Sequence, residues 1–186
     1  MADTWDNKIY LADPADLASR LGAPSDDAKL LASLKRASDR FIGQIGYPLH
    51  KITDDEYWAT GDGGPTIALP AAPIVGEPTV EINGTAATGY QVGRRSGLLW
   101  RPGGWPRGLE NVRVVYTHGY DQIPGDVQDA VLDAAEADHS IRAGIESVTT
   151  GNESVKFASN RVAGGTTPAW AAAVDKYTLH WAGDGE

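Results

Sequence analysis

The sequence predicts an α+β fold: a small α-helical bundle with a β-hairpin-rich insertion between its second and third helices, followed by an extended C-terminal tail. Apolar residues recur every three or four positions over 13–46 and 124–143, which is the spacing of helices. Over 57–117 they form short runs separated by Gly, Pro and Asn, a pattern typical of hairpins. We expect one domain spanning 1–186, whose tail covers 144–186.

The first helical region is expected to contain a short helix and a longer one. Asp13 offers an N-cap carboxylate, Pro14 suits the first helical position, and Gly22 ends the short helix. Ser25, followed by two Asp residues, is a second N-cap signal for the longer helix, which stops near Gly46. Its apolar residues have helical spacing: Leu30, Leu31, Leu34, Ala37, Phe41 and Ile45.

Six short strands are predicted in the insertion. They cover 57–60, 66–69, 79–82, 90–92, 98–100 and 111–117. Asn83 and Gly84 predict a type I′ turn, because both central residues of that turn need a positive φ. In the last strand Val112, Val114 and Tyr116 are expected to face the core, since alternate residues of a strand share one face.

The sequence GDGG at 61–64 admits two interpretations. A phosphate-binding loop places backbone N–H groups and a helix N-terminus at the phosphate, and a Lys follows the glycines. Here Pro65 and a strand-like segment follow, without a Lys. We therefore expect a hairpin turn at this position.

A third helix is predicted from Pro124, a favoured first position, to about Arg142. Its apolar residues are mostly small: Val127, Ala130, Val131, Ala134, Ala137 and Ile141. An acidic stripe runs beside them and comprises Asp126, Asp129, Asp133 and Glu136. Beyond Gly144 the tail is polar and Gly-rich, with a strand-like piece at 154–157 and an amphipathic stretch around Trp170 and Trp181. We expect this tail to order against a partner.

Composition excludes several classes of function. With 16 Lys and Arg against 25 Asp and Glu, the net charge of -9 repels phosphate, and no basic run offsets it. The chain has no Cys, which excludes disulfides, a Cys nucleophile and thiolate metal sites. No segment approaches the about 18 apolar residues of a membrane span, and the N-terminus lacks signal-peptide features. We expect a soluble chain without a membrane partner or a cleaved signal.

Aromatic and arginine side chains gather in the Gly- and Pro-rich turn WRPGGWPRG. They are Trp100, Arg101, Trp105 and Arg107. These residue types are enriched where proteins dock on proteins. We expect the turn to dock on another protein, or the two Trp side chains to cover the hairpins' own core as lids; both can hold. Trp170 and Trp181 of the tail are further candidates for a protein interface.

No catalytic constellation is recognisable, so no enzyme, metal or cofactor is predicted. One alternative is a small metal-dependent hydrolase using Glu136, His139 and Asp133, because Glu-x-x-His places a carboxylate and an imidazole on one helix face. The helix predicted from Ser25 contains no Glu or His to complete such a site. A second alternative is a glycan- or protein-binding β module with an aromatic platform. That platform would comprise Trp58, Trp100 and Trp105.

Several short motifs follow one another in a fixed order. They are Phe41-Ile42-Gly43, the Trp-x-x-Gly-Asp-Gly-Gly segment from Trp58, Leu69-Pro70, Pro73-Ile74, the Gly-Gly-Trp-Pro-Arg-Gly turn from Gly103, the Val-x-Val-x-Tyr-x-x-Gly-Tyr segment from Val112, and the Ile-Pro-x-Asp start of a helix at Ile123. This ordered set, over roughly 11–157, resembles the head-tail connector, or head-to-tail adaptor, proteins of long-tailed double-stranded DNA bacteriophages.

The resemblance implies a structural virion protein without enzymatic activity. Members of that family assemble in the host cytoplasm into a homo-oligomeric ring, commonly dodecameric, beneath the portal protein in the virion neck. The ring extends the channel for double-stranded DNA and presents a surface to a downstream connector, stopper or tail-completion protein. For such a ring we expect the acidic stripe to line the channel, where it would repel phosphates and let the duplex slide.

Overall fold

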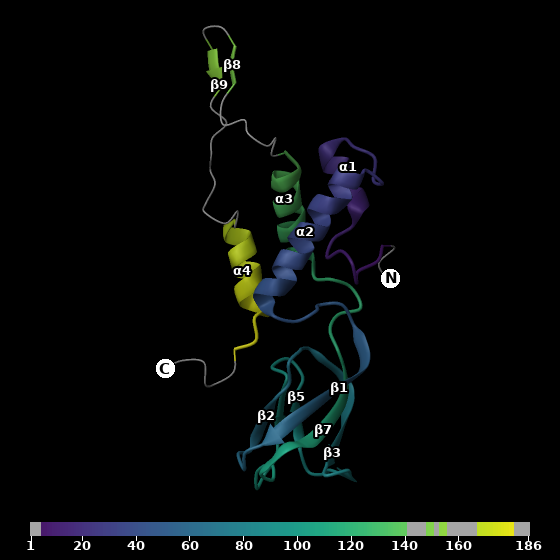
Figure 1. Ribbon diagram of the computed structural model, residues 1–186, viewed down its shortest axis with the longest axis vertical. Coiled ribbons are helices and arrows are strands. Elements are labelled where there is room, and N and C mark those ends of the chain that lie inside the picture. Colours follow the sequence, from purple (N-terminus) through teal and green to yellow (C-terminus); the bar gives the residue numbers. More distant parts are fainter. Residues whose placement is uncertain (1–4, 141–147, 151–152, 156–166, 181–186) are drawn as a thin grey trace. The chain divides into compact units, whose positions relative to one another are not determined.

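The computed structural model describes residues 5–140, 148–150, 153–155 and 167–180 (Figure 1). Within these residues, four helices and three antiparallel sheets form, so the prediction of a mixed α+β fold is confirmed. Contacts divide the chain into two compact units. We call them the helical unit, which comprises 3–44 and 123–177, and the β unit, which is built mainly on 45–122 and also includes 1–2 and 178–186.

The helical unit begins with two capped helices. Helix α1 spans Pro14–Leu21; the Asp13 carboxylate accepts a hydrogen bond from the Ala15 N–H at 2.8 Å, as the sequence predicts. Helix α2 spans Ala28–Ile45, and its cap is Asp27, whose carboxylate accepts from the Leu30 N–H at 2.8 Å. The predicted start at Ser25 is therefore too early, because the last of three consecutive capping residues supplies the cap.

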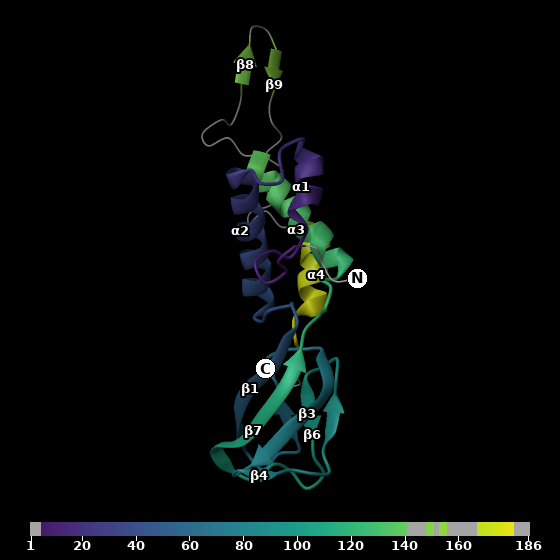
Figure 2. The same cartoon turned by 90° about the vertical axis from the view of Figure 1, so that its right-hand side faces the viewer.

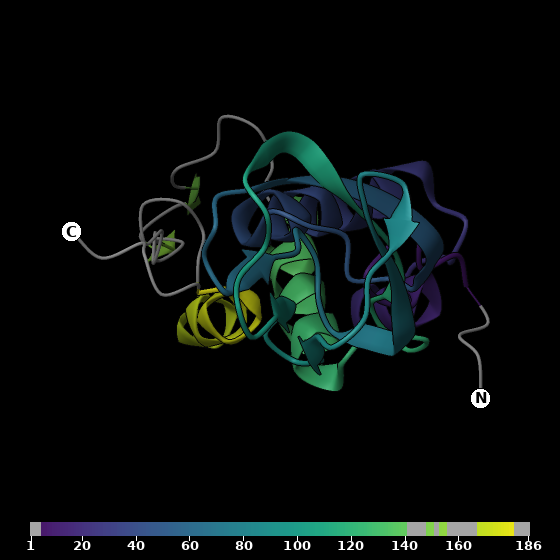
Figure 3. The same ribbon diagram turned by 90° about the horizontal axis from the view of Figure 1, so that it is seen from below.

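Helix α3 spans Gly125–Ser140 and is covered on several sides (Figures 2 and 3). It contacts α1 and α4, and polar side chains of α2 reach it. Leu132 and Ala135 are therefore buried beside the predicted apolar positions, whereas Ala137 is exposed, contrary to prediction. The predicted Ile141 lies outside the described residues.

The C-terminal region contains a helix where an extended tail was predicted. Helix α4 spans Pro168–Tyr177, and the Thr167 hydroxyl accepts from the Trp170 N–H at 3.1 Å at its start. Strands β8 (Val148–Thr150) and β9 (Glu153–Val155) pair with each other, so the predicted strand-like piece is observed up to Val155. Residues 156–157 and Trp181 lie outside the described residues.

The β unit consists of two antiparallel sheets. Its strands are β1 (Ile52–Gly61), β2 (Thr66–Ala68), β3 (Ile74–Ile82), β4 (Thr85–Ala86), β5 (Gln91–Gly93), β6 (Leu98–Trp100) and β7 (Gly108–His118). The strand orders are β1-β7-β3-β4 and β2-β6-β5. Each of the six predicted strands overlaps an observed one; β4, with two residues, is too short to give a sequence pattern. Val112, Val114 and Tyr116 are buried, as expected.

Two predicted turns have different outcomes. Asn83 (φ 49°) and Gly84 (φ 76°) both adopt the positive φ that a type I′ turn needs, which confirms that turn. The hairpin predicted at 61–64 is wrong, because β1 pairs with β7 and β2 pairs with β6. The GDGG segment instead crosses from one sheet to the other, and the hydrophobic residues that flank it end in different sheets.

Candidate docking surfaces

Trp105 belongs to the core of the β unit. Its side chain is fully buried, and its Nε1–H donates to the Pro65 carbonyl oxygen at 3.1 Å. The GDGG segment at 61–64, which crosses between the two sheets, also binds the backbone of Trp105. The Gly63 N–H donates to the Trp105 carbonyl at 2.9 Å, and the Trp105 N–H donates to the Gly64 carbonyl at 2.8 Å. A side chain at Gly104 would place its Cβ 2.2 Å from the Gly63 oxygen, so only glycine fits there. Of the two predicted roles, docking on another protein and covering the core of the hairpins, the burial of Trp105 matches the second.

Trp100, Arg101 and Arg107 of the WRPGGWPRG turn are exposed or half-buried. Trp100 is 42% exposed on β6, between Thr66 and Gln91 of the neighbouring strands. Arg101 donates to the Gly104 carbonyl at 2.9 Å and lies over the Trp105 ring, and Arg107 is exposed. The predicted protein interface therefore stays a prediction for Trp100, Arg101 and Arg107, with Trp105 beneath them.

A second exposed tryptophan lies on the other sheet, within a cluster of hydrogen-bonded side chains. Trp58 of β1 is 48% exposed, and its Nε1–H donates to a Glu56 carboxylate oxygen at 2.6 Å. Arg113 of β7 donates to Glu56 at 2.8 Å and to Glu81 at 3.3 Å. The hydrogen bonds from Arg113 and Trp58 hold the pKa of Glu56 below its ordinary value. Sequence reasoning missed this cluster; the signal is a Trp, an Arg and two Glu on the polar face of paired strands.

The aromatic platform of the β-module alternative does not form. It required Trp105 at the surface beside Trp58 and Trp100, and Trp105 is buried. A hollow of about 350 Å³ does lie between the edge strands β1 and β2, and Trp58, Thr66 and Ile67 are among its lining residues. The β unit thus offers one exposed Trp on each sheet in place of a three-ring surface.

Each carboxylate of the acidic stripe has a cationic neighbour inside the helical unit. Guanidinium nitrogens of Arg20, on α1, lie 3.6 Å from Asp129, 2.7 Å from Asp133 and 4.0 Å from Glu136. Asp126 contacts the Lys176 ammonium at 2.6 Å and accepts from the Tyr177 hydroxyl at 2.9 Å. The stripe therefore joins α3 to α1 and α4. Its place along a DNA channel is not tested by these contacts and stays a prediction.

The Asp126 contact makes stability depend on pH. Burial alone opposes ionisation of Asp126, but the hydrogen bonds from Lys176 and Tyr177 outweigh it, so the pKa of Asp126 lies below its ordinary value. Burial and the bond to Asp126 raise the pKa of Tyr177 to about 12, so its hydroxyl stays a donor. A carboxyl with a lowered folded-state pKa stabilises the fold above its unfolded-state pKa and loses that contribution on acidification.

We therefore expect Asp126→Asn to lower the free energy of unfolding near neutral pH by roughly 0.2–1 kcal/mol, the range of exposed ion pairs. The gap to wild type should close as pH falls through the pKa of Asp126. Urea denaturation of both proteins from about pH 7 to about pH 3, which spans the ordinary Asp pKa of about 3.9, measures it. A gap that stays constant would show that ionisation of Asp126 does not contribute.

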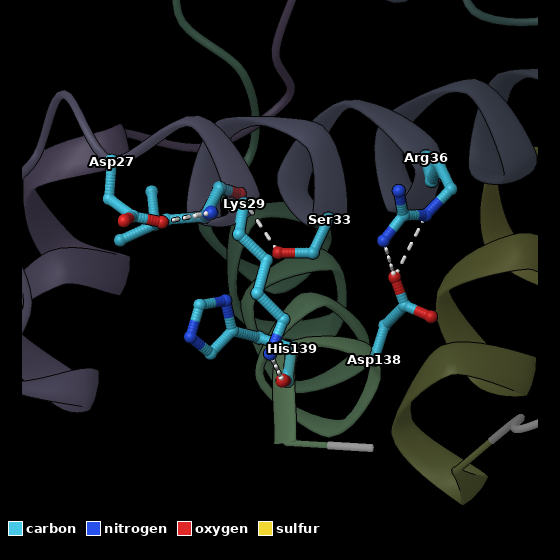
Figure 4. Close-up of polar contacts among 7 residues, drawn as sticks. Asp27, Lys29, Ser33, Arg36, Asp138 and His139 are labelled. Carbon is cyan, nitrogen blue, oxygen red and sulfur yellow. Dashed lines mark hydrogen bonds and ion pairs between the residues drawn. The ribbon is translucent and has the colours of Figure 1, made fainter. Parts of the chain in front are cut away.

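The metal-hydrolase alternative receives no support from its proposed ligands. Glu136 lies beside Arg20, and the backbone carbonyl of His139 accepts from the Lys29 ammonium at 2.7 Å (Figure 4). Among the described residues, no group of three or more His, Asp or Glu side chains could hold a metal ion. The acidic side chains of α3 contact cations of neighbouring helices instead.

Trp170, a predicted interface residue, is buried inside the helical unit. Its ring packs edge-on against Phe41 of α2, with centroids 5.2 Å apart, and its Nε1–H donates to the Gln44 side-chain oxygen at 2.6 Å. The Arg40 guanidinium lies 4.4 Å from the Trp170 centroid on the ring face. This part of the tail therefore orders against α2 and α3 of the same chain.

Comparisons with known proteins identify the fold. No protein-family model matches the chain, and no curated protein sequence does. A chain in the neck of an empty gene transfer agent (GTA) particle, computed with C6 symmetry, is 17% identical, with a TM-score of 0.54 over 97% of this chain and 95% of that one. A chain in the neck of the native particle, with C12 symmetry, is 16% identical, with a TM-score of 0.53 and the same coverage. The resemblance to neck proteins thus holds at the level of the fold.

Within the described part of the chain, no helix is long and apolar enough to cross a membrane.

Proposed function

We propose that this chain is a structural protein of a virion neck, a head-to-tail adaptor that forms a ring beneath the portal, extends the DNA channel and joins the capsid to the tail. The observation that carries the proposal is the fold shared, over nearly the whole of both chains, with neck components of a GTA particle. Those necks were resolved with sixfold and twelvefold symmetry, which is what a closed ring of identical subunits gives.

The proposed partners are a portal protein on one side of the ring and a stopper or tail-completion protein on the other. The whole chain acts as one adaptor domain in this proposal, with the helices as a bundle and the β unit as its insertion. Exposed Trp100 and the hydrogen-bonded cluster of Trp58, Glu56 and Arg113 support it, because Trp and Arg dominate the energetics of protein interfaces. The proposed location is the virion neck, reached after assembly in the host cytoplasm, and no catalysis is assigned.

Electron microscopy of the purified protein, alone and with its portal protein, tests the proposal. We expect a ring with a central opening, coaxial with the portal, at a stoichiometry of one adaptor per portal subunit or a simple fraction of it. A chain that stays monomeric with the portal at every concentration, and that is missing from purified virions, would contradict the proposed function.

Trp100→Ala should separate docking from folding. Because Trp100 is 42% exposed, we expect the free energy of unfolding to change by less than about 1 kcal/mol. Incorporation into virions, measured by quantitative mass spectrometry, should fall on the order of tenfold if Trp100 is an interface anchor. Gln91→Ala, the exposed cross-strand neighbour, is the matched control and should assemble normally. Normal incorporation of the Trp100 variant would remove this residue from the interface.

A further inference from the structure

Helices α2 and α3 enclose a shallow, positively charged hollow. Its volume is about 220 Å³, and its lining comprises Arg36, Ala37, Arg40, Ala134 and Asp138. Ala37 and Ala134 are 5% and 9% exposed, so the floor is small and apolar while the rim is charged. This combination suits a short charged side chain that buries its carbon atoms and keeps its charge at the rim.

The charges at the rim do not balance. The Arg36 guanidinium pairs with the Asp138 carboxylate, with an Nε to Oδ2 distance of 2.9 Å (Figure 4). Arg40 contacts the face of Trp170 and forms no ion pair with the described residues of the helical unit. The hollow therefore has two cations and one carboxylate, a local excess of one positive charge on a chain of net charge -9. An acidic group is the ligand that this excess favours.

The acidic stripe faces away from this hollow. Asp129 and Asp138 are nine residues apart on α3, and at about 100° per residue they project on opposite sides of the helix. The Asp129 side chain is 75% exposed, and its nearest cation, Arg20, is 3.6 Å away. The helical unit thus presents, on one side, a cation that has an aromatic contact but no ion pair among the described residues, and an exposed carboxylate on the other. A head-to-tail contact requires two different surfaces that complement each other in this way.

We propose that Arg40, in the hollow between α2 and α3, binds Asp129 of a second copy of this chain, and that this contact repeats around the ring. The inference rests on the proposed function and names the subunit contact within it. It also moves Asp129 from the predicted channel lining to the subunit boundary. Reversal of either charge should weaken self-association at least about tenfold, since a close interfacial charge pair is coupled that strongly.

Two single variants, Arg40→Glu and Asp129→Arg, test the contact when they are studied separately and then mixed. Alone, each places like charges at every boundary and should fail to form rings. Mixed in equal amounts, they should assemble in strict alternation, because each boundary then joins either the two reversed residues or the two native ones. Native mass spectrometry under conditions in which the wild type assembles should show rings with an even number of subunits and equal content of the two variants.

Matched variants control for net charge and folding. Lys35→Glu makes the same change five residues away on α2, at a residue that already pairs with Asp39, and should assemble normally. Asp16→Arg does the same for an exposed carboxylate of α1. If Arg40→Glu fails to fold, Arg40→Gln replaces it, and weaker self-association of the folded Arg40→Gln protein is then the expected result.

The possible outcomes separate this inference from the proposed function. If each reversed variant alone forms rings as readily as the wild type does, the Arg40–Asp129 contact is overturned and the adaptor proposal stays intact. Loss of duplex DNA binding in Arg40→Glu, without recovery of rings on mixing, would assign the hollow to phosphate and also overturn it. A wild type that forms no ring with its portal overturns both. Recovery of rings only in the mixture supports the contact.

Discussion

Replacing Trp105 with Ala should lower the free energy of unfolding of the β unit by about 3–5 kcal/mol, the cost of removing a large aromatic side chain from a packed core. The indole is fully buried among residues of both sheets. The variant also loses the Nε1–H bond to the Pro65 carbonyl, which connects the turn to the crossing loop. Urea denaturation followed by circular dichroism measures the loss.

Trp100→Ala is the control for that experiment, because it removes the same side chain at an exposed position five residues earlier. It should stay within about 1 kcal/mol of the wild type. A Trp105→Ala protein as stable as the wild type but absent from virions would contradict the core assignment. In that case the docking interpretation of Trp105 would be correct.

Trp170→Ala should have a comparable effect on the helical unit, with a loss of about 3–5 kcal/mol and of the α4 helical signal. Helix α4 has ten residues, fewer than an isolated helix needs in water, so its stability depends on packing. The contacts that hold it include the Phe41 ring, the Gln44 amide and the Arg40 guanidinium. Thermal unfolding followed by far-ultraviolet circular dichroism measures both changes.

Trp170→Phe distinguishes packing from the single hydrogen bond. It keeps an aromatic ring against Phe41 and removes the Nε1–H that donates to Gln44, so we expect a loss of about 1 kcal/mol with α4 retained. A loss as large as that of Trp170→Ala would show that the hydrogen bond, rather than aromatic burial, holds the helix. No loss in either variant would contradict the packing of α4 on α2.

Elements whose signals are local could be predicted from the sequence. The short helix needs only Asp13, Pro14 and Gly22, and the Asn83-Gly84 turn needs only two residues that tolerate a positive φ. Most strands were recognised because alternation and turn residues lie within a few positions of each other. The observed start of a helix differs from the predicted one where several neighbouring residues could act as the N-cap. Helix α2, for example, is capped by Asp27 and not by Ser25.

Elements that depend on distant partners could not be predicted. Helix α4 is held by Gln44, 126 positions earlier in the chain, and no local pattern encodes that contact. The hairpin prediction at 61–64 failed for the same reason, since the partner of β1 is β7 and not the next strand. Strand pairing of this kind is decided by tertiary packing, which a residue pattern does not report.

The candidate sites divide in the same way. The residue types of the WRPGGWPRG turn left docking and a lid over the core both open, and they did not show that Trp105 is buried while Trp100 is exposed. That distinction depends on the loop at Gly63 and Gly64, about forty positions away. The acidic stripe was visible from spacing alone, whereas its pairing with Arg20 and Lys176 required the arrangement of α1 and α4. Arg36 and Arg40 are four apart on α2, but the hollow that they line also needs Ala134 and Asp138 of α3, which the spacing on one helix does not report.

The division of the chain into units has a consequence for the order in which the protein folds during synthesis. The seven strands of the β unit, β1 to β7, lie in one continuous segment, 52–118, so they emerge from the ribosome in direct succession. The helical unit does not: Leu30, Leu34 and Phe41 of α2 are made early, but α3 and α4 follow only after the whole β unit. We therefore expect the nascent chain to carry an uncovered apolar helix face until α3 and α4 are made, and exposed apolar surface of this kind favours misassociation.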